Sequence, residues 1–400
     1  MNFIFISPQF PSNYWNFCAQ LKNNGVNVLG ISDASYDSLK YQLKSVLTEY
    51  YKVENLEDYN QVMKAVAYFT FKYGKIDWLE SNNEYWLEQD AKLRTDFHII
   101  TGFNLDEVQK AKYKSIMKEL YQQFQIPTAP YVIADNPEKC RAFAKKTGYP
   151  IVVKPDRGMK IKEIHLLNNE TDLEEFLNVS QNETWIMEQY INGSVWSYDA
   201  IINSNGTPVF ESGSVTPVSA LDIVNQQEDV YFYILKKIPE DLKEIGRRCV
   251  EAFHVKSRFI HFEFFHLNKD QDGVGKKGDF IALKSNMCPR GGYVFDMLNY
   301  ANSTDVYRIW ASMVAFDDYK EANHYDQFFC CLIARRDDKN YIHSHNEVLS
   351  KYRANITLSN KILENSTTIV GGQTYLAKFA EETAMKQFVQ FALSRESSQN

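Results

Sequence analysis

The chain has 400 residues, more than one compact core usually holds. Of these residues, 44% are hydrophobic and 14% are aromatic. Its formal net charge of −7 argues against a general nucleic-acid binder, which would present a basic face or tail. No apolar run approaches the roughly 20 residues that cross a bilayer, and six scattered cysteines without a C-x-x-C pair fit reduced thiols. We therefore expect a cytoplasmic protein that binds neither nucleic acid nor membrane.

The beginning of the chain alternates apolar strands with helices. Strands are predicted at 3–7 and 26–32, on either side of a helix at 12–25. This order implies a parallel sheet with a right-handed crossover. The pattern continues with a strand at 49–53, a helix at 56–74 and a strand at 76–81, so residues 1–105 are expected to form a parallel α/β domain.

The middle of the chain mixes helices with strands that pair as hairpins. One long charged helix is predicted around 105–124, and a second helix at 136–150 begins with Asn136 as its N-cap. Strands follow at 151–156, 162–167 and 185–191. Further on, two strands at 257–267 and 279–286 are expected to pair antiparallel, and an amphipathic helix at 376–396 closes the pattern.

Two charged side chains in these elements need an explanation. Lys154 ends the apolar run "PIVV", where a lysine is not expected to be buried without an anionic partner. Glu263 lies among aromatic residues in "FIHFEFF", with His261 two residues earlier on the same strand face. A metal ion or Lys284 on the neighbouring strand could neutralise Glu263. Lys112, taken alone, is typical of a solvated helix lysine.

Five segments in this order resemble the ATP-grasp superfamily, in the branch of the carbamoyl-phosphate-synthase large chain and biotin carboxylase. The resemblance covers about 110–300 and rests on "KAKYKSIMKELYQQFQIPTAPYVI", "GYPIVVKPDRG", "WIMEQYINGSVWSYD", "HFEFF" and "ALKSNMCPRGG". It implies that the N-terminal parallel α/β domain precedes an ATP-grasp fold of two α+β subdomains. The expected small subdomain, with the lysine and hinge region, is 106–195, and the large subdomain with a C-terminal extension is 196–400.

The resemblance also implies a function. In this family ATP phosphorylates a carboxylate, and an amine or similar nucleophile then displaces phosphate from the acyl phosphate. The implied partner is a small-molecule carboxylate or amino-acid substrate, and the resemblance allows a homodimer. Residues that match the family's motifs would contact the phosphates (Lys112, Lys154), bind adenine (Glu188, Tyr190, Ile191), line the cleft (Asp199) and hold Mg²⁺ (Glu263, Asn286).

The chain departs from the family's pattern at the expected metal site. Lys284 stands where a bridging carboxylate is usual, and Cys288 stands where an arginine is usual. An ammonium supplies no oxygen ligand and repels Mg²⁺. The loop after the lysine strand has Gly158 alone, with Lys160 and Lys162 added.

Two hypotheses follow from these departures. In the first, the protein is an active ligase in which Arg290 replaces the missing arginine and one Mg²⁺ suffices. In the second, Lys284 pairs with Glu263, and the chain binds a nucleotide or another anion without Mg²⁺, as a partner or regulatory subunit. A scaffold without a ligand is a third interpretation, but it leaves Lys154 and Glu263 unexplained. Asp222 and Arg290 are candidates for the acceptor pocket.

Overall fold

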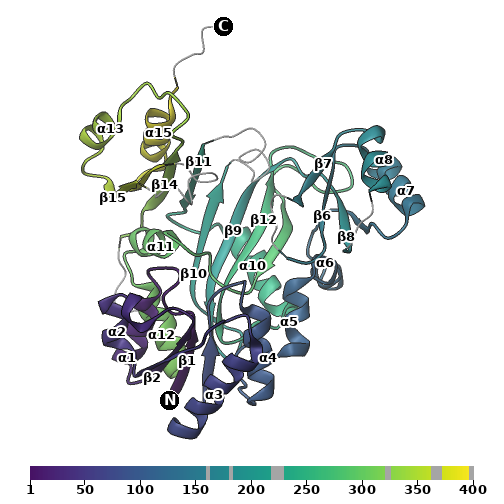
Figure 1. Ribbon diagram of the computed structural model, residues 1–400. Coiled ribbons are helices and arrows are strands. Elements are labelled where there is room, and N and C mark those ends of the chain that lie inside the picture. Colours follow the sequence, from purple (N-terminus) through teal and green to yellow (C-terminus); the bar gives the residue numbers. More distant parts are fainter. Residues whose placement is uncertain (159–162, 180–182, 218–228, 320–325, 362–371, 396–400) are drawn as a thin grey trace.

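The described residues form three β-sheets, and the strands of each sheet come from a different part of the sequence (Figure 1). They are seen in a computed structural model, which describes residues 1–158, 163–179, 183–217, 229–319, 326–361 and 372–395. One sheet is parallel and two are antiparallel, which confirms the predicted fold class. The domain boundaries near residues 105 and 195 remain predictions.

The first sheet is parallel and has the strand order β3-β2-β1-β4. Ile4 of β1 pairs with Leu29 of β2 and with Leu79 of β4, and all three side chains are fully buried. Apolar strands of this kind need helices on both faces. The elements are β1 (Asn2–Ile6), α1 (Trp15–Asn23), β2 (Asn27–Ser32), η1 (Tyr36–Ser38), α2 (Tyr41–Val46), β3 (Glu49–Lys52), α3 (Tyr59–Tyr73), β4 (Trp78–Glu80) and α4 (Leu87–Asp96).

The second sheet is small, antiparallel and covered on one face by two helices. Cys140 of α7 and Leu173 of α8 belong to the same apolar cluster as Ile151 and Val153 of the sheet. Asn136 caps α7, as predicted, by accepting hydrogen bonds from the backbone N–H groups of Glu138 and Lys139. In sheet order the strands are β5 (Tyr131–Ile133), β8 (Trp185–Gln189), β6 (Ile151–Pro155) and β7 (His165–Leu167), and the helices are α7 (Pro137–Thr147) and α8 (Glu170–Asn178).

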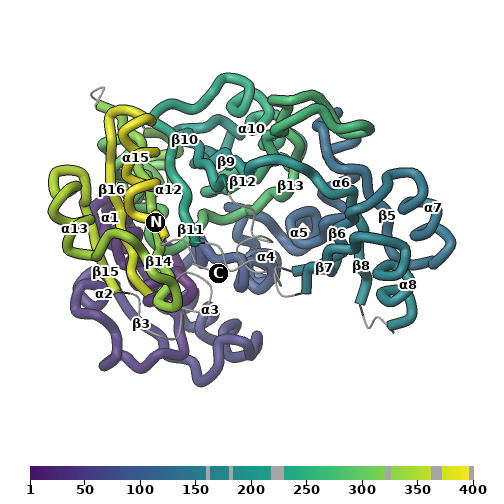
Figure 2. Tube along the Cα trace, turned by 90° about the horizontal axis from the view of Figure 1, so that it is seen from above, coloured from purple at the N-terminus to yellow at the C-terminus, as the bar shows by residue number. Residues whose placement is uncertain are grey.

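The third sheet has eight strands and forms the centre of the molecule (Figure 2). In sheet order they are β13 (Phe280–Asn286), β12 (Arg258–Leu267), β9 (Gly193–Ile202), β10 (Pro208–Thr216), β11 (Val230–Ile234), β14 (Phe329–Arg335), β16 (Gln373–Phe379) and β15 (Ile356–Lys361). The antiparallel pairing of β12 with β13 agrees with the prediction for 257–267 and 279–286.

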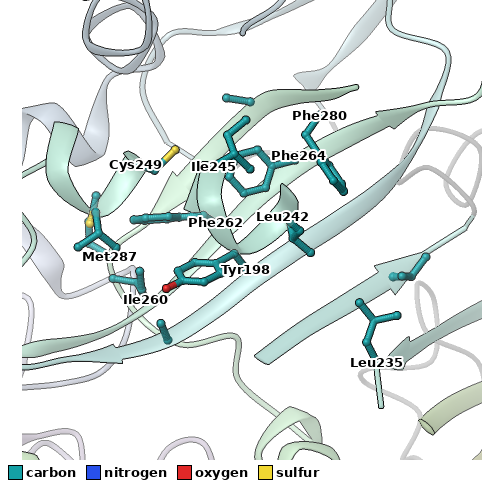
Figure 3. Close-up of a cluster of buried hydrophobic side chains, with 14 of the residues drawn as sticks. Tyr198, Leu235, Leu242, Ile245, Cys249, Ile260, Phe262, Phe264, Phe280 and Met287 are labelled. Carbon is teal, nitrogen blue, oxygen red and sulfur yellow. The ribbon is translucent and has the colours of Figure 1, made fainter. Parts of the chain in front are cut away.

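One face of this sheet packs against α10 (Glu240–Ala252). Leu242, Ile245 and Cys249 of the helix join the cluster that contains Tyr198 and Phe262 of the sheet (Figure 3). A Cβ at Gly246 would lie 2.3 Å from Cγ of Tyr198, so glycine allows the helix to approach the ring. The alternation along β9 and β12 then directs Asp199, His261 and Glu263 to the opposite face.

The predicted helix at 105–124 is wrong in one respect, because the structure has two helices. They are α5 (Leu105–Lys112) and α6 (Lys114–Gln123), and Tyr113 between them has extended backbone angles. Asp156, at the end of β6, accepts hydrogen bonds from the N–H and the hydroxyl of Ser115, and its carbonyl accepts one from the N–H of Lys114. The break therefore depends on a contact with a distant strand.

One helix in the last part of the chain, α12 (Val306–Phe316), packs against α1. Trp310 and Tyr307 of α12 pack against Phe17 of α1, with ring centroids 4.8 and 4.7 Å apart, which extends the core of the first sheet. The predicted helix at 376–396 begins too early, because its first residues lie in β16. The remaining helices are α11 (Val294–Asn302), α12 (Val306–Phe316), α13 (His345–Lys351) and α15 (Glu382–Leu393).

Two expectations from composition can be compared with the structure. All six cysteines are free and buried. Among the described residues, no helix combines the length and the apolar character needed to span a membrane.

A buried charge cluster ties the first sheet to β12. Glu80, at the end of β4, accepts hydrogen bonds from Arg94 at 2.8 Å and Arg258 at 2.9 Å through the same carboxylate oxygen, Oε2. Arg258 also donates to the carbonyl of Met287, at 2.8 Å. Asp90 lies in the same cluster, where burial and the charge of Glu80 raise its pKa to about 7 against the opposing effects of Arg94 and Ser81.

We expect Asp90→Asn to remove one component of the pH dependence of stability. The unfolded pKa of aspartate is about 3.9, so between about pH 4 and 7 the folded state binds a proton that the unfolded state does not. Stability from Asp90 is therefore present at low pH and lost as the pH rises through about 7. Urea unfolding should show the variant gaining on the wild type by up to about 4 kcal/mol between about pH 4 and 8. Exposed Asp37→Asn is the control, and a constant difference for Asp90→Asn would contradict the assignment.

Candidate functional site

Two buried lysines share one carboxylate on the small sheet. Glu188 of β8 lies 3.0 Å from the ammonium of Lys154 on β6 and 3.4 Å from that of Lys118 on α6. Burial raises the pKa of Glu188, but the charges of Lys118 and Lys154 outweigh it and lower the pKa overall. Burial lowers the pKa of Lys118 to about 8, although Glu188 opposes the shift. Glu188 is thus the anionic partner that the sequence analysis predicted for a buried Lys154.

Lys114 is a member of the site that sequence reasoning missed. Its ammonium donates to the carbonyls of Pro155 at 2.6 Å and Gly158 at 2.9 Å, and so fixes the loop after β6. Burial, together with the charges of Lys154 and Lys284, lowers its pKa to about 8 against the opposing charges of Asp156 and Glu188. One lysine of the small sheet and one of the large sheet therefore both lower the pKa of Lys114. The signal available in the sequence was the spacing of lysines in "KAKYKSIMK".

The other predicted phosphate lysine, Lys112, faces the first sheet. Its ammonium donates to the carbonyl of Glu84 at 3.3 Å and lies 3.7 Å from the Glu84 carboxylate. Glu84 belongs to the loop after β4, and sequence reasoning did not single it out. The break at Tyr113 thus separates Lys112 from Lys114, each with its own set of contacts.

The predicted hinge residues lie at the junction of the two antiparallel sheets. Ile191 is buried in a small apolar cluster with Ala129, Leu267 and Ile281. The carbonyl of Tyr190 accepts a hydrogen bond of 2.5 Å from the side chain of Gln271, in the loop between β12 and β13. The same side chain accepts one from the N–H of Asn192 at 3.1 Å, so the large sheet holds the hinge directly.

A histidine lies between the two carboxylates on the face of the large sheet. Nδ1 of His261 is 2.7 Å from Asp199, and Nε2 is 3.4 Å from Glu263. Burial lowers the pKa of His261, but the charge and hydrogen bond of Asp199, with those of Glu263, raise it to about 9. Burial likewise opposes the ionisation of Glu263, but His261, Lys284 and Arg290 lower its pKa to about 2. Both groups are therefore charged near neutral pH.

The pairing of β12 with β13 brings the remaining predicted residues to the same place. Glu263 stands opposite Lys284, and His261 stands opposite Asn286. The side-chain oxygen of Asn286 is buried and has no hydrogen-bond partner among the described residues. An acceptor oxygen in this state is suited to a cation or to a donor from a ligand.

Two further residues follow at the end of β13. The half-buried guanidinium of Arg290 lies over the ring of Phe232, 4.1 Å from its centroid. The thiol of Cys288 lies 3.8 Å from the carboxylate of Glu84, and burial and that carboxylate raise its pKa. The predicted acceptor-pocket residue Asp222, as well as Lys160 and Lys162, lies outside the described residues.

Comparisons with known proteins agree with this arrangement. The family model "Carbamoyl-phosphate synthase L chain, ATP binding domain" matches residues 111–197, which include Lys114, Lys118, Lys154 and Glu188. The carbamoyl phosphate synthase large chain of Agathobacter rectalis is 24% identical over 177 residues, which are 42% of this chain and 16% of that protein. The chain therefore spans only a small part of this relative's length.

Solved structures extend the likeness to the whole fold. An L-amino acid ligase from Bacillus licheniformis superposes with a TM-score of 0.72 at 14% identity, covering 97% of this chain and 96% of that one. This chain has the ATP-grasp fold. Another ATP-grasp structure is the biotin carboxylase domain of a 2-oxoglutarate carboxylase from Hydrogenobacter thermophilus, solved as a dimer with MgADP, ADP and bicarbonate. Its TM-score is 0.66 at 12% identity, with 98% and 90% of the two chains covered.

The donor set of this ATP-grasp site fits one Mg²⁺ better than two. Glu263 offers a carboxylate and Asn286 an unpartnered oxygen, and Mg²⁺ commonly takes one or two carboxylates together with substrate phosphates. Lys284 stands opposite Glu263 and offers an ammonium in place of a second oxygen ligand. Within the described ranges, no group of three or more His, Cys, Asp and Glu residues is placed to hold a metal ion. The remaining ligands would have to come from the nucleotide and water.

We expect Glu188→Gln to destabilise the protein strongly. Removing the shared carboxylate leaves Lys118 and Lys154 buried without a counter-charge, which costs about 3–5 kcal/mol in other buried ion pairs. Chemical unfolding should show this loss, and the double variant Glu188→Gln with Lys118→Met should regain part of it. Exposed Glu119→Gln on α6 is the control. A loss below about 1 kcal/mol for Glu188→Gln would show that water reaches these lysines.

Proposed function

We propose that this protein binds ATP between its two antiparallel sheets and uses it to activate a carboxylate. The observation that carries the proposal is the convergence of cations from both sheets. Lys114, beside Lys154 of the small sheet, has its pKa lowered also by Lys284 of the large sheet, and Glu263 senses both Lys284 and Arg290. Placing these cations close together costs electrostatic free energy unless a polyanion binds among them, and a triphosphate has the required charge.

The proposed reaction has two steps. An oxygen of the acceptor carboxylate attacks the γ-phosphorus, the bond to the bridging oxygen breaks, and ADP leaves with that electron pair. An amine or similar nucleophile then attacks the carbonyl carbon of the acyl phosphate. The bond from carbon to the phosphate oxygen breaks, inorganic phosphate leaves, and the nucleophile loses a proton to solvent.

The residues have distinct proposed roles in these steps. Lys154 and Lys114 neutralise phosphate charge from the small-sheet side, and Glu188 keeps Lys154 in place. Lys112 is proposed to contact phosphate from the side of the first sheet, and Tyr190 and Ile191 to provide the adenine hinge. Lys284 and Arg290 stabilise the charge that develops during phosphoryl transfer.

The remaining polar residues on the large sheet would support a cation. Glu263 and Asn286 would hold one Mg²⁺, which when bound would neutralise phosphate charge. Asp199 orients His261 at 2.7 Å, and His261 in turn approaches Glu263. The homodimer suggested by the sequence stays a prediction, for which the dimeric biotin carboxylase domain is a precedent.

A second function has one specific observation in its favour. Glu263 lies 3.4 Å from His261 and stands opposite Lys284, so two cations of the chain already face the proposed metal ligand. In this alternative the protein binds a nucleotide or another anion without Mg²⁺ and acts as a partner or regulatory subunit. Calorimetric titration with ATP separates the two functions, since only the ligase requires tighter binding when Mg²⁺ is present.

Phosphate release is the first test of the ligase. The wild type, given ATP, Mg²⁺ and pooled amino acids, should release phosphate faster than with ATP and Mg²⁺ alone. Arg290→Gln should lower this rate by about 100-fold or more, because a cation next to the transferred group is lost. Arg141→Gln, in an exposed ion pair with Glu174, is the matched control. The proposal is contradicted if neither the amino-acid pool nor a pool of carboxylates without an amino group raises the rate above that with ATP and Mg²⁺ alone.

Lys284→Glu tests whether the lysine at this position limits the effect of Mg²⁺ on ATP binding. The variant restores an oxygen ligand opposite Glu263, so Mg²⁺ should increase its ATP affinity by about 10-fold more than in the wild type. Without Mg²⁺ the variant should bind ATP more weakly than the wild type, because a cation has become an anion. Calorimetry measures both effects, with exposed Lys277→Glu as the control. An unchanged magnesium dependence would show that Lys284 does not occupy a metal-ligand position.

A further inference from the structure

Glu84 is a half-buried carboxylate whose contacts are all long. Its side chain is 17% exposed, and its two oxygens lie 3.7 Å from the ammonium of Lys112 and 3.8 Å from the thiol of Cys288. A short charge-assisted hydrogen bond to a carboxylate usually spans about 2.7–2.9 Å. Within the part of the chain that the structure describes, these are the only side-chain partners of the Glu84 carboxylate. The group is therefore desolvated without being tightly paired.

Other acceptor oxygens near the loop that carries Glu84 also lack partners. Oε1 of Gln9 and Oδ1 of Asn13, both in the loop after β1, are buried and make no hydrogen bond within the described ranges of the chain. The hydroxyl of Tyr14 donates to the carbonyl of Asn82 at 2.7 Å, which ties this loop to the one that carries Glu84. β1 and β4 are parallel neighbours at the reversal of the strand order, where α/β sheets bind ligands at their carboxyl ends.

A cation that can receive a carboxylate lies beside this group of acceptors. Arg290 follows Cys288 by two residues, and its guanidinium contacts the ring of Phe232 but, among the described residues, no carboxylate. The amide of Asn13 donates to the carbonyl of Gly292 at 3.0 Å, so the segment after β13 and the loop after β1 are in direct contact. A free guanidinium and a loosely paired carboxylate thus lie on adjoining segments.

We propose that the acceptor of this site is an amino acid, with its carboxylate at Arg290 and its ammonium at Glu84. The inference rests on the proposed function, because the carboxylate at Arg290 is the one that ATP would activate. Glu84 supplies the negative charge for the ammonium, and Asn13 and Gln9 supply neutral acceptor oxygens. A dicarboxylate of similar size would place a negative charge against Glu84, so the site discriminates against it.

The test compares ligands that differ only in the ammonium. Thermal-shift titration of the full chain uses each common L-amino acid and the matching carboxylic acid without the amino group, for example alanine against propionate. At least one amino acid should bind about 10-fold or more tightly than its counterpart, because a charge-assisted contact in a partly desolvated place is lost without the ammonium. In Glu84→Gln this preference should fall to about 3-fold or less.

Glu54→Gln, at a side chain in the same domain that is 81% exposed, should keep the wild-type preference. Equal binding of the paired ligands by the wild type, no binding of any amino acid, or an unchanged preference in Glu84→Gln would each overturn the inference. The comparison within the wild type stands even if Glu84→Gln does not fold.

Phosphate release separates this inference from the proposed function. If carboxylates without an amino group drive phosphate release as well as amino acids do, the protein is a ligase and the inference about Glu84 fails. If amino acids bind with the expected preference but no carboxylate drives phosphate release, the Glu84 site stands and the ligase proposal fails.

Discussion

The carboxylate of Glu188 lies between the ammonium groups of Lys118 and Lys154, and this shared ion pair holds the small sheet and α6 in their relative positions. An ammonium group that leaves water needs a negative charge nearby, or it gives up its proton. The same requirement places Glu80 between Arg94 and Arg258, where the first sheet meets β12. Two shared carboxylates thus hold the small sheet against α6 and the first sheet against β12.

The cations without such a carboxylate stand out against this background. Lys114 donates to backbone carbonyls, and Arg290 lies on an aromatic ring, and among the described residues neither contacts a carboxylate. Lys114 and Arg290 are therefore the cations of this site that are available to an anionic ligand. Glu84 presents the complementary case of an acid that is only loosely paired, with the ammonium of Lys112 at 3.7 Å. Ligand recognition in this protein is therefore inferred from unpaired charge.

The sequence predicted the parts of the site that depend on local pattern. The pairing of β12 with β13, and with it the opposition of Glu263 and Lys284, followed from two apolar strands and a polar turn. Lys114 could not be predicted in the same way, because the break at Tyr113 depends on Asp156, about forty residues later. The start of the last helix was misplaced for a similar reason, since β16 forms through pairing with β14 and β15. Glu84 lies on a loop of the first sheet and was outside the matched motifs.

The central claim is that the terminal phosphate of ATP passes to a carboxylate oxygen, and an isotope experiment tests it most directly. Pooled amino acids with ¹⁸O in their carboxylates, incubated with the protein, ATP and Mg²⁺, transfer one labelled oxygen to phosphate when an acyl phosphate is formed and then attacked by an amine. The account predicts released inorganic phosphate that carries a single ¹⁸O, measured by mass spectrometry. Released phosphate with oxygen from water alone, or no phosphate release above that of ATP alone, would contradict it.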